Sequence, residues 1–355
     1  MLFGQYDFTC QLETDAQLPY YKGSTFRGVF GRALKKVVCA LKRQECETCL
    51  LNSKCVYALV FETPIAGKSK DARMAATPHP FVIEPPLTIK THYPAGSAFD
   101  FSLLLMGDAN NYLPYFIYAF EQMGKIGIGK KINGRRGRFV LENVRINDDV
   151  IYSSADQKLN MNGNVKKLGL ESPKILSDKN LRLTLTLETP LRLKFGNKLQ
   201  AAMPFHVLVR AMLRRVSSLM NAYGDGEPDL DYKGLVQRAE TVKIAENNLS
   251  WFDWQRYSFR QDQKMLMGGM AGSVTYEGSI NEYLPLLKFC EKVHLGKQTA
   301  FGLGKLQFET RQSRARVSKW SVELFHEKYP AGRHGIESPG DHGNHLRAAS
   351  KQPER

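Results

Sequence analysis

The order of apolar and polar residues in the second half of the chain predicts alternating strands and helices. Residues 181–187 alternate Leu with Arg and Thr, which is typical of a strand with one buried face. Residues 205–223 are predicted to form a helix, because Pro204 stands where a helix can begin and Gly224 and Gly226 would end it. A strand, a helix and a closing strand are then expected at residues 274–276, 283–293 and 306–308.

The same plan is present twice, because two parts of the chain repeat one another. Residues 107–114 and 278–285 share Gly, Asn, Tyr, Leu and Pro in register. The pair Gly129-Lys130 precedes a later glycine by the same spacing as the pair Gly296-Lys297. Each copy therefore reads as strand, helix, strand, strand, helix, strand, which is the ferredoxin-like order.

The repeat predicts an α+β protein of two tandem ferredoxin-like units. We expect an N-terminal unit at 1–147 with a Cys-rich insertion at about 39–55, and a C-terminal unit at 181–310. The polar stretch 148–180 is interpreted as a hairpin and linker. The tail 311–355 ends in residues rich in Gly, His, Pro and charge, and from about residue 331 it is predicted to be disordered.

Charge changes this picture, because Lys and Arg exceed Asp and Glu by 15 (50 against 35) among the 355 residues. Such an excess attracts polyanions, with nucleic acid the first expectation and acidic membranes the second. No apolar run approaches the length of a bilayer span, and residues 1–7 do not resemble a secretion signal. We therefore expect a soluble cytoplasmic protein that binds nucleic acid rather than a membrane.

A glycine-rich, basic segment precedes the last strand of each copy. Residues 124–138 contain six basic residues, five glycines and no acid, and residues 296–305 keep the glycines with fewer charges. Glycines let backbone N–H groups approach phosphates, and Lys and Arg neutralise them. The alternative is that these are tight turns whose glycines only satisfy positive φ angles. The predicted RNA contacts are Lys130, Lys131, Arg135, Arg136, Arg138, Gly296, Lys297, Gln298, Phe301, Gly302, Gly304 and Lys305.

Four cysteines lie close together in the N-terminal copy, at Cys39, Cys46, Cys49 and Cys55. The two-residue spacing between Cys46 and Cys49 lets both thiolates reach one metal ion, and four thiolates suit tetrahedral zinc. We predict a structural zinc ion, with an iron–sulfur cluster or ordinary reduced thiols as alternatives. No catalytic metal is implied, because protein ligands would fill all four positions. Cys10 and Cys290 stand in apolar patterns and are predicted to be core residues.

The stretch 294–305 resembles the C-terminal glycine-rich signature of CRISPR-associated RAMP endoribonucleases, which process precursor CRISPR RNA. Softer motifs at 26–34, 78–81 and 268–272 fit one branch of that family, which has an N-terminal four-cysteine insertion. The resemblance covers residues 23–309 and implies two ferredoxin-like units of the RRM/RAMP type, side by side. It implies precursor CRISPR RNA as the partner, with CRISPR effector subunits as a further possibility.

The resemblance also implies a metal-independent reaction, in which the RNA's own 2′-hydroxyl attacks the adjacent phosphate and leaves a 2′,3′-cyclic phosphate. Family members commonly carry a catalytic His in or before the first helix, whereas residues 1–78 of this chain contain no His. The candidates at the matching place are Tyr21, Lys22 and Arg27, and His79 between two prolines is the alternative acid or base. His206 and His294 are the next candidates.

A second hypothesis is a non-catalytic RAMP subunit that only holds CRISPR RNA inside an effector complex. The missing N-terminal His favours this hypothesis, whereas the glycine-rich signature and the tandem layout favour the enzyme. Trp251, Phe252, Trp254 and Tyr257, interleaved with Arg256 and Arg260, are a candidate stacking platform for single-stranded RNA or the packed side of a hairpin.

Overall fold

The computed structural model describes residues 1–42, 45–62, 77–161, 165–171, 180–193, 203–258 and 263–312. Side chains are described throughout these ranges except at 254–258, 263–267 and 312. The predicted disordered tail therefore lies outside the described residues, and so do the side chains of Trp254, Arg256, Tyr257 and Arg260.

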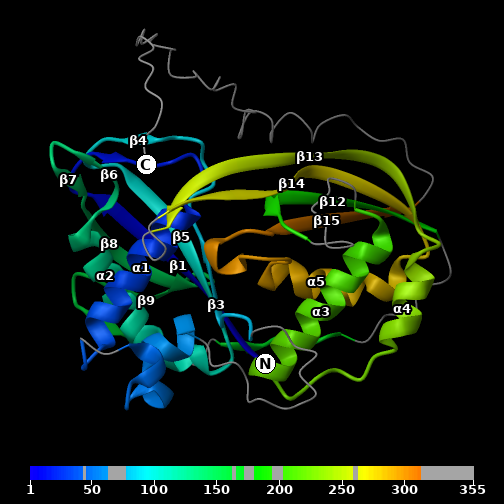
Figure 1. Cartoon of the computed structure of the whole chain (residues 1–355), viewed down its shortest axis with the longest axis horizontal. Coiled ribbons are helices and arrows are strands. Elements are labelled where there is room, and N and C mark those ends of the chain that lie inside the picture. The colour runs from blue at the N-terminus through cyan, green and yellow to red at the C-terminus, as the bar shows by residue number, and fades with distance from the viewer. Residues whose placement is uncertain are drawn as a thin grey trace, which may run out of the picture.

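The N-terminal unit has the predicted order of elements (Figure 1). Its β1 (Leu2–Leu12), α1 (Gly23–Val38), β3 (Phe81–Glu84), β5 (Ala98–Met106), α2 (Leu113–Ile126) and β8 (Phe139–Ile146) follow one another along the chain. The antiparallel sheet has the order β8-β1-β5-β3, so the first strand lies between the last and the third, as in ferredoxin-like folds. Phe26 and Phe30 of α1 and Phe120 of α2 pack against this sheet, which closes the first core.

The described part of 148–180 adds strands to the first sheet. Within this stretch β9 (Asp149–Ser153) and β10 (Lys158–Leu159) form a hairpin, and β9 pairs with β8 of the first sheet. The short β11 (Lys166–Lys167) pairs with the beginning of β1, on the edge opposite β5 that β8 occupies further along the strand. This stretch therefore belongs structurally to the first sheet rather than running free between the units.

The C-terminal unit repeats the plan with β12 (Leu181–Leu191), α3 (Phe205–Tyr223), α4 (Tyr232–Ala239), β13 (Lys243–Ser258), β14 (Gln263–Gly278), α5 (Leu284–Val293) and β15 (Leu306–Gln312). Its sheet order, β13-β14-β12-β15, matches that of the first unit. The helix predicted at 205–223 is observed with the same bounds. The predicted strand at 274–276 was too short, because β14 pairs with β13 along its whole length. Two ferredoxin-like units in tandem are confirmed.

A small third sheet, β4 (His92–Tyr93), β2 (Ala16–Gln17), β6 (Ile128–Ile132) and β7 (Arg135–Gly137), lies beside α1. The glycine-rich basic segment of the first unit, which was interpreted as a loop, forms the β6–β7 hairpin, so that interpretation is corrected. Gly127, Gly129 and Gly134 have φ angles of 82°, 82° and 81°. These positive φ angles agree with the alternative interpretation, in which the glycines serve the geometry of tight turns.

Short helical turns complete the fold: η1 (Cys46–Thr48), η2 (Asn52–Lys54), η3 (Ala58–Glu62), η4 (Gly107–Tyr112), η5 (Asn281–Tyr283) and η6 (Thr299–Phe301). Cys10 and Cys290 are fully buried, which confirms that they are core residues. None of the helices among the described residues has the length and apolar character that a bilayer crossing needs.

The two units meet along β3 and β5 of the first sheet. Successive residues of a strand point to opposite faces, so Phe81 and Ile83 join the first core while Val82, between them, joins the core of the second unit. Leu104 and Met106 of β5 likewise pack in the second core. Both faces of this edge of the sheet are therefore covered, and the seam between the units is lined by buried side chains.

Candidate functional site

The glycine-rich segment 294–305 of the second unit lies against the chain just before α1 of the first unit. The Tyr21 hydroxyl donates a hydrogen bond to the Phe301 carbonyl at 2.6 Å. A Cβ atom on Gly23 would stand 1.9 Å from the same oxygen, so only glycine fits there. The predicted RNA-binding signature and the predicted catalytic segment, far apart in sequence, are therefore in contact.

Arg27 joins three aromatic rings at this contact. Its guanidinium lies 4.5 Å from the centre of the Phe301 ring and 5.1 Å from that of Phe61, and both are cation–π distances. Its Nη2 atom is 3.3 Å from Nε2 of His79. Phe301 is buried, so its ring packs on Arg27 and does not face solvent as a base-stacking surface would.

His79 is held as a neutral imidazole. Its Nδ1 atom lies 3.1 Å from the Val60 carbonyl, which can only accept, so Nδ1 carries the proton and Nε2 accepts from Arg27. Burial, and next the positive charge of Arg27, lower the pKa of His79 to about 4. A neutral ring at pH 7 suits a general base rather than a general acid.

Lys22 has no exposed surface. Its Nζ atom donates to the carbonyls of Tyr20 and Thr88 at 3.1 and 2.5 Å, and burial lowers its pKa to about 8. The ammonium thus ties the segment before α1 to the loop after β3. The structure brings Tyr21, Arg27 and His79 to the seam and places Lys22 behind them as an anchor.

Two residues at the seam carry no signal in the sequence. Glu84, at the end of β3, accepts from His294 Nε2 at 2.7 Å and from Lys305 Nζ at 2.8 Å. Arg215 of α3 is buried and donates to the carbonyls of Val293 and His294. An acid ending an apolar strand and an arginine within a helix are common patterns, so only the docking of the units reveals their roles.

The remaining residues of the predicted loop have different surroundings. Gly302 and Gly304 are buried, whereas Lys297 is exposed. The backbone at Gln298 is left-handed, and its Oε1 atom is buried with no hydrogen-bond partner among the residues that the structure describes. Gly296 has a φ of 87° and directs the chain back towards Arg192, whose carbonyl accepts from the Lys297 amide.

The β6–β7 hairpin and the residue after it carry several exposed Lys and Arg side chains of the first unit. Arg138 pairs with Glu13 at 2.8 Å, and Arg136 donates to the Gly129 carbonyl. Lys130, Lys131 and Arg135 are exposed, and none of them has an acidic partner within ion-pair distance in the described part of the chain. These three residues are therefore the part of the predicted contact set that is open to a polyanion.

Cys39 follows the end of α1, and the other three cysteines border two consecutive turns. Cys46 and Cys49 bound η1, Cys55 follows η2, and the Asn52 side chain donates to the Cys46 carbonyl. Burial and the neighbouring Glu62, Cys55 and Cys39 raise the pKa of the Cys46 thiol, while Lys35 opposes them. In the ranges that the structure covers, no three His, Cys, Asp or Glu side chains are gathered to hold a metal ion.

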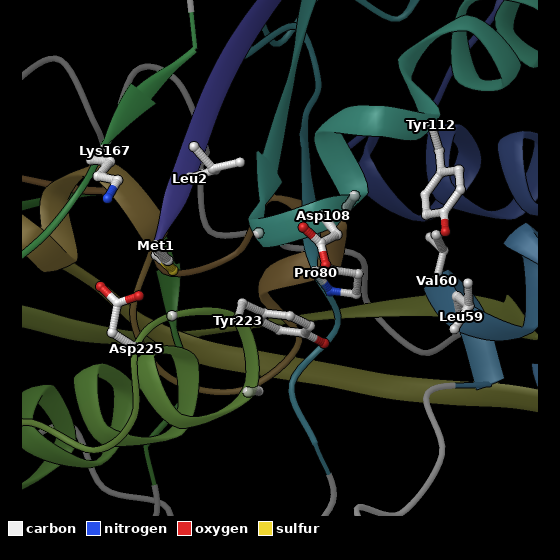
Figure 2. Close-up of a pocket in the computed structure, with 14 residues that line it drawn as sticks. Met1, Leu2, Leu59, Val60, Pro80, Asp108, Tyr112, Lys167, Tyr223 and Asp225 are labelled. Carbon is white, nitrogen blue, oxygen red and sulfur yellow. The ribbon is translucent and has the colours of Figure 1, made fainter.

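A cavity of about 520 Å³ lies between the units (Figure 2). Asp108, Pro80 and Val60 line it from the first unit, and Tyr223 and Asp225 line it from the second. The Tyr223 hydroxyl donates to the Pro78 carbonyl, which helps to fix the segment that carries His79. The cavity contains none of the predicted site residues.

Comparisons with known proteins agree with the fold. Residues 185–306 match the family model of the CRISPR-associated endoribonuclease Cas6, and residues 1–164 match a model described as an N-terminal domain. An uncharacterized protein of Archaeoglobus fulgidus is 26% identical over 299 residues, which are 81% of this chain and 91% of that protein.

Solved structures show the same fold at low identity. A partial Cas6-RT-Cas1–Cas2 complex contains a chain with a TM-score of 0.54 and 12% identity; the match covers 89% of this chain and 47% of that one. The full complex gives the same TM-score with 30% of its chain covered, so this chain spans less than half the length of either. Thermus thermophilus Cas6 has a TM-score of 0.49 and 13% identity, with 87% and 98% covered. Residues 185–306 of this chain are therefore similar to the CRISPR-associated endoribonuclease Cas6.

Proposed function

We propose that this protein binds CRISPR repeat RNA and cleaves precursor CRISPR RNA by attack of a 2′-hydroxyl on the adjacent phosphate. The products are a 2′,3′-cyclic phosphate and a 5′-hydroxyl. One observation carries the proposal: the glycine-rich loop of the unit that matches the Cas6 model lies on the Tyr21, Arg27 and His79 cluster of the other unit. An RNA held by the loop would therefore place a phosphate beside a cation and a neutral imidazole.

Arg27 and His79 can divide the chemistry between them. The guanidinium can neutralise the charge that develops on the phosphorane. If Arg27 turns from His79 to the phosphate, Nε2 of His79 loses its donor and can take the proton of the 2′-hydroxyl. Tyr21, whose hydroxyl now donates to the loop, is the proposed proton donor to the leaving 5′-oxygen.

The second candidate is a non-catalytic RNA-binding subunit of a CRISPR effector complex. Two observations favour it: no His stands in residues 1–78, and Lys22 and Phe301 are buried in structural contacts. Association with other CRISPR proteins is proposed for either candidate. Incubating the protein with its host's repeat RNA in EDTA separates the two, because the enzyme would cut at one position and the subunit would bind without cutting.

RNA binding by the β6–β7 hairpin is testable by removing two exposed charges. Lys130→Ala with Lys131→Ala should weaken repeat RNA binding and lower the slope of log Kd against log salt by about 1.4, since each lost phosphate contact on a single strand removes about 0.7. Titrations at four salt concentrations measure this slope. Lys233→Ala with Lys243→Ala, in and after α4 at the opposite end of the molecule, is the matched control (Figure 1). Equal slopes for all three proteins would remove the hairpin from the interface.

We further propose that Cys39, Cys46, Cys49 and Cys55 bind one structural zinc ion, on the chemistry of four thiolates at the end of α1 and in the two turns that follow. Elemental analysis of freshly purified protein should give about one zinc per chain. Cys46→Ser with Cys49→Ser should lose the metal and lower the unfolding temperature. Cys290→Ala, a core cysteine outside the turns, should keep the zinc. Wild-type protein without zinc or iron would contradict the proposal.

A further inference from the structure

The helix α5 ends at a residue with an unfavourable backbone conformation. His294 has φ 59° and ψ 158°, a region that residues with a Cβ rarely adopt. The repeat places Gly127 at the same position after α2, with φ 82° and ψ 157°. The same turn is thus made by glycine in the first unit and by histidine in the second. Since glycine makes this turn without strain, the histidine side chain is expected to contribute an interaction that glycine cannot.

That interaction joins the two units. The His294 ring is fully buried, with Nδ1 3.1 Å from the Leu303 carbonyl and Nε2 2.7 Å from a carboxylate oxygen of Glu84. The carbonyl can only accept, and so can the ionised carboxylate, so both ring nitrogens carry protons and the imidazole is positively charged. Leu303 belongs to the glycine-rich loop, and Glu84 ends β3 of the first unit.

Several charged groups lie around the ring. Lys305, which directly precedes β15, donates to the second oxygen of Glu84 and lies 3.8 Å from Glu188 of β12, and Arg215 of α3 donates to the His294 carbonyl. Burial alone would raise the pKa of Glu84, but hydrogen bonds and charges from His294 and Lys305 outweigh it and lower the pKa to about 2. Glu84 therefore stays ionised near neutral pH.

We propose that His294 is a latch that fastens the glycine-rich loop of the second unit to β3 of the first. The ring, with a proton on each nitrogen, holds both Leu303 and Glu84. Without the ring both hydrogen bonds are lost, and the loop is less firmly held. The latch does not depend on the proposed function, but if that function is right, His294 is a positioning residue for Arg27, because Phe301 is part of the same loop.

Hydrogen exchange of the loop amides tests the latch without RNA. The Leu295 amide donates to the Gly304 carbonyl, and the Gly304 amide donates to the Pro190 carbonyl, so both report on the loop. At pH 6 their protection should be about tenfold lower in His294→Gly, which keeps the turn and removes the ring, than in wild type.

Glu84→Gln leaves the strained backbone unchanged and should also lower the protection of these amides, and amides of β1 should not change in either variant. Full protection of these loop amides in His294→Gly or in Glu84→Gln would overturn the latch. A protein that never cleaves RNA but shows the expected exchange would refute the proposed function and leave the latch in place.

Discussion

A single 2′-deoxy substitution at the nucleotide just 5′ of the scissile phosphate is expected to abolish cleavage of repeat RNA by the wild-type protein. The 2′-oxygen is the proposed nucleophile, so its removal should cost the whole catalytic acceleration, which for enzymes is typically at least about 10⁶-fold. Binding should change by less than about threefold, because the phosphates that the exposed cations contact are still present. Single-turnover cleavage in EDTA and a binding titration on the same RNA measure the two quantities.

A 2′-deoxy substitution one nucleotide further upstream is the control, and this RNA should be cut at the normal rate. If the first substrate is also cut, water is the nucleophile and the proposed mechanism is wrong. If both substrates lose binding, the hydroxyl groups are contacts rather than reactants. If the unmodified RNA binds tightly and is never cut, the protein is the non-catalytic subunit.

The repeated architecture was predictable because its signals are local. The motif shared by residues 107–114 and 278–285 marks the start of the second helix in both units, and Pro204 and Gly224 bound the helix between them. Each of these residues affects the backbone only within a few positions of itself. The order of elements therefore followed from the sequence, and the order of strands in each sheet followed from the fold type.

Strand lengths and the nature of one loop depended on partners distant in the chain. β14 contains Gly268, Gly269 and Gly272, which suggest a break, yet β13 pairs with it across all three positions. The glycines of 124–138 were interpreted for phosphate binding, whereas Gly129 and Gly137 stand where a Cβ would collide with β2 residues Gln17 and Ala16. Close packing in the third sheet explains these glycines, and the exposed lysines of the hairpin do not depend on them.

The sequence indicated which residues form the site, but not how these residues lie relative to one another. Tyr21, Arg27, His79 and Phe301 were all named from the sequence, but nothing local indicates that the loop of one unit covers the first helix of the other. That docking arises because Val82 and Ile83 are both apolar, so that β3 has two buried faces. The docking also explains why the sequence did not indicate a role for Glu84, whose partners His294 and Lys305 belong to the other unit.

Arg27→Ala and His79→Ala are each expected to lower the single-turnover cleavage rate by about 10²-fold to 10⁴-fold, the usual effect of losing a general base or the cation opposite a developing charge. RNA affinity should change far less. His92→Ala, an exposed His on β4, is the control and should cleave at the wild-type rate. Arg27→Lys keeps the charge but loses the planar contact with Phe301, so it should recover only part of the rate.

The pH dependence distinguishes a base from a packing residue. Since the pKa of His79 is lowered to about 4, the base is already neutral at pH 5.5, and the wild-type rate should be flat from there to pH 7.5 and fall towards pH 4. Arg27 is one cause of that lowering, so in Arg27→Ala the pKa of His79 should rise and the acid limb should move to higher pH. His79→Ala should show no such limb. If the acid limb of Arg27→Ala stays at the wild-type position, His79 is not the base, and Tyr21 with Lys22 becomes the pair to examine.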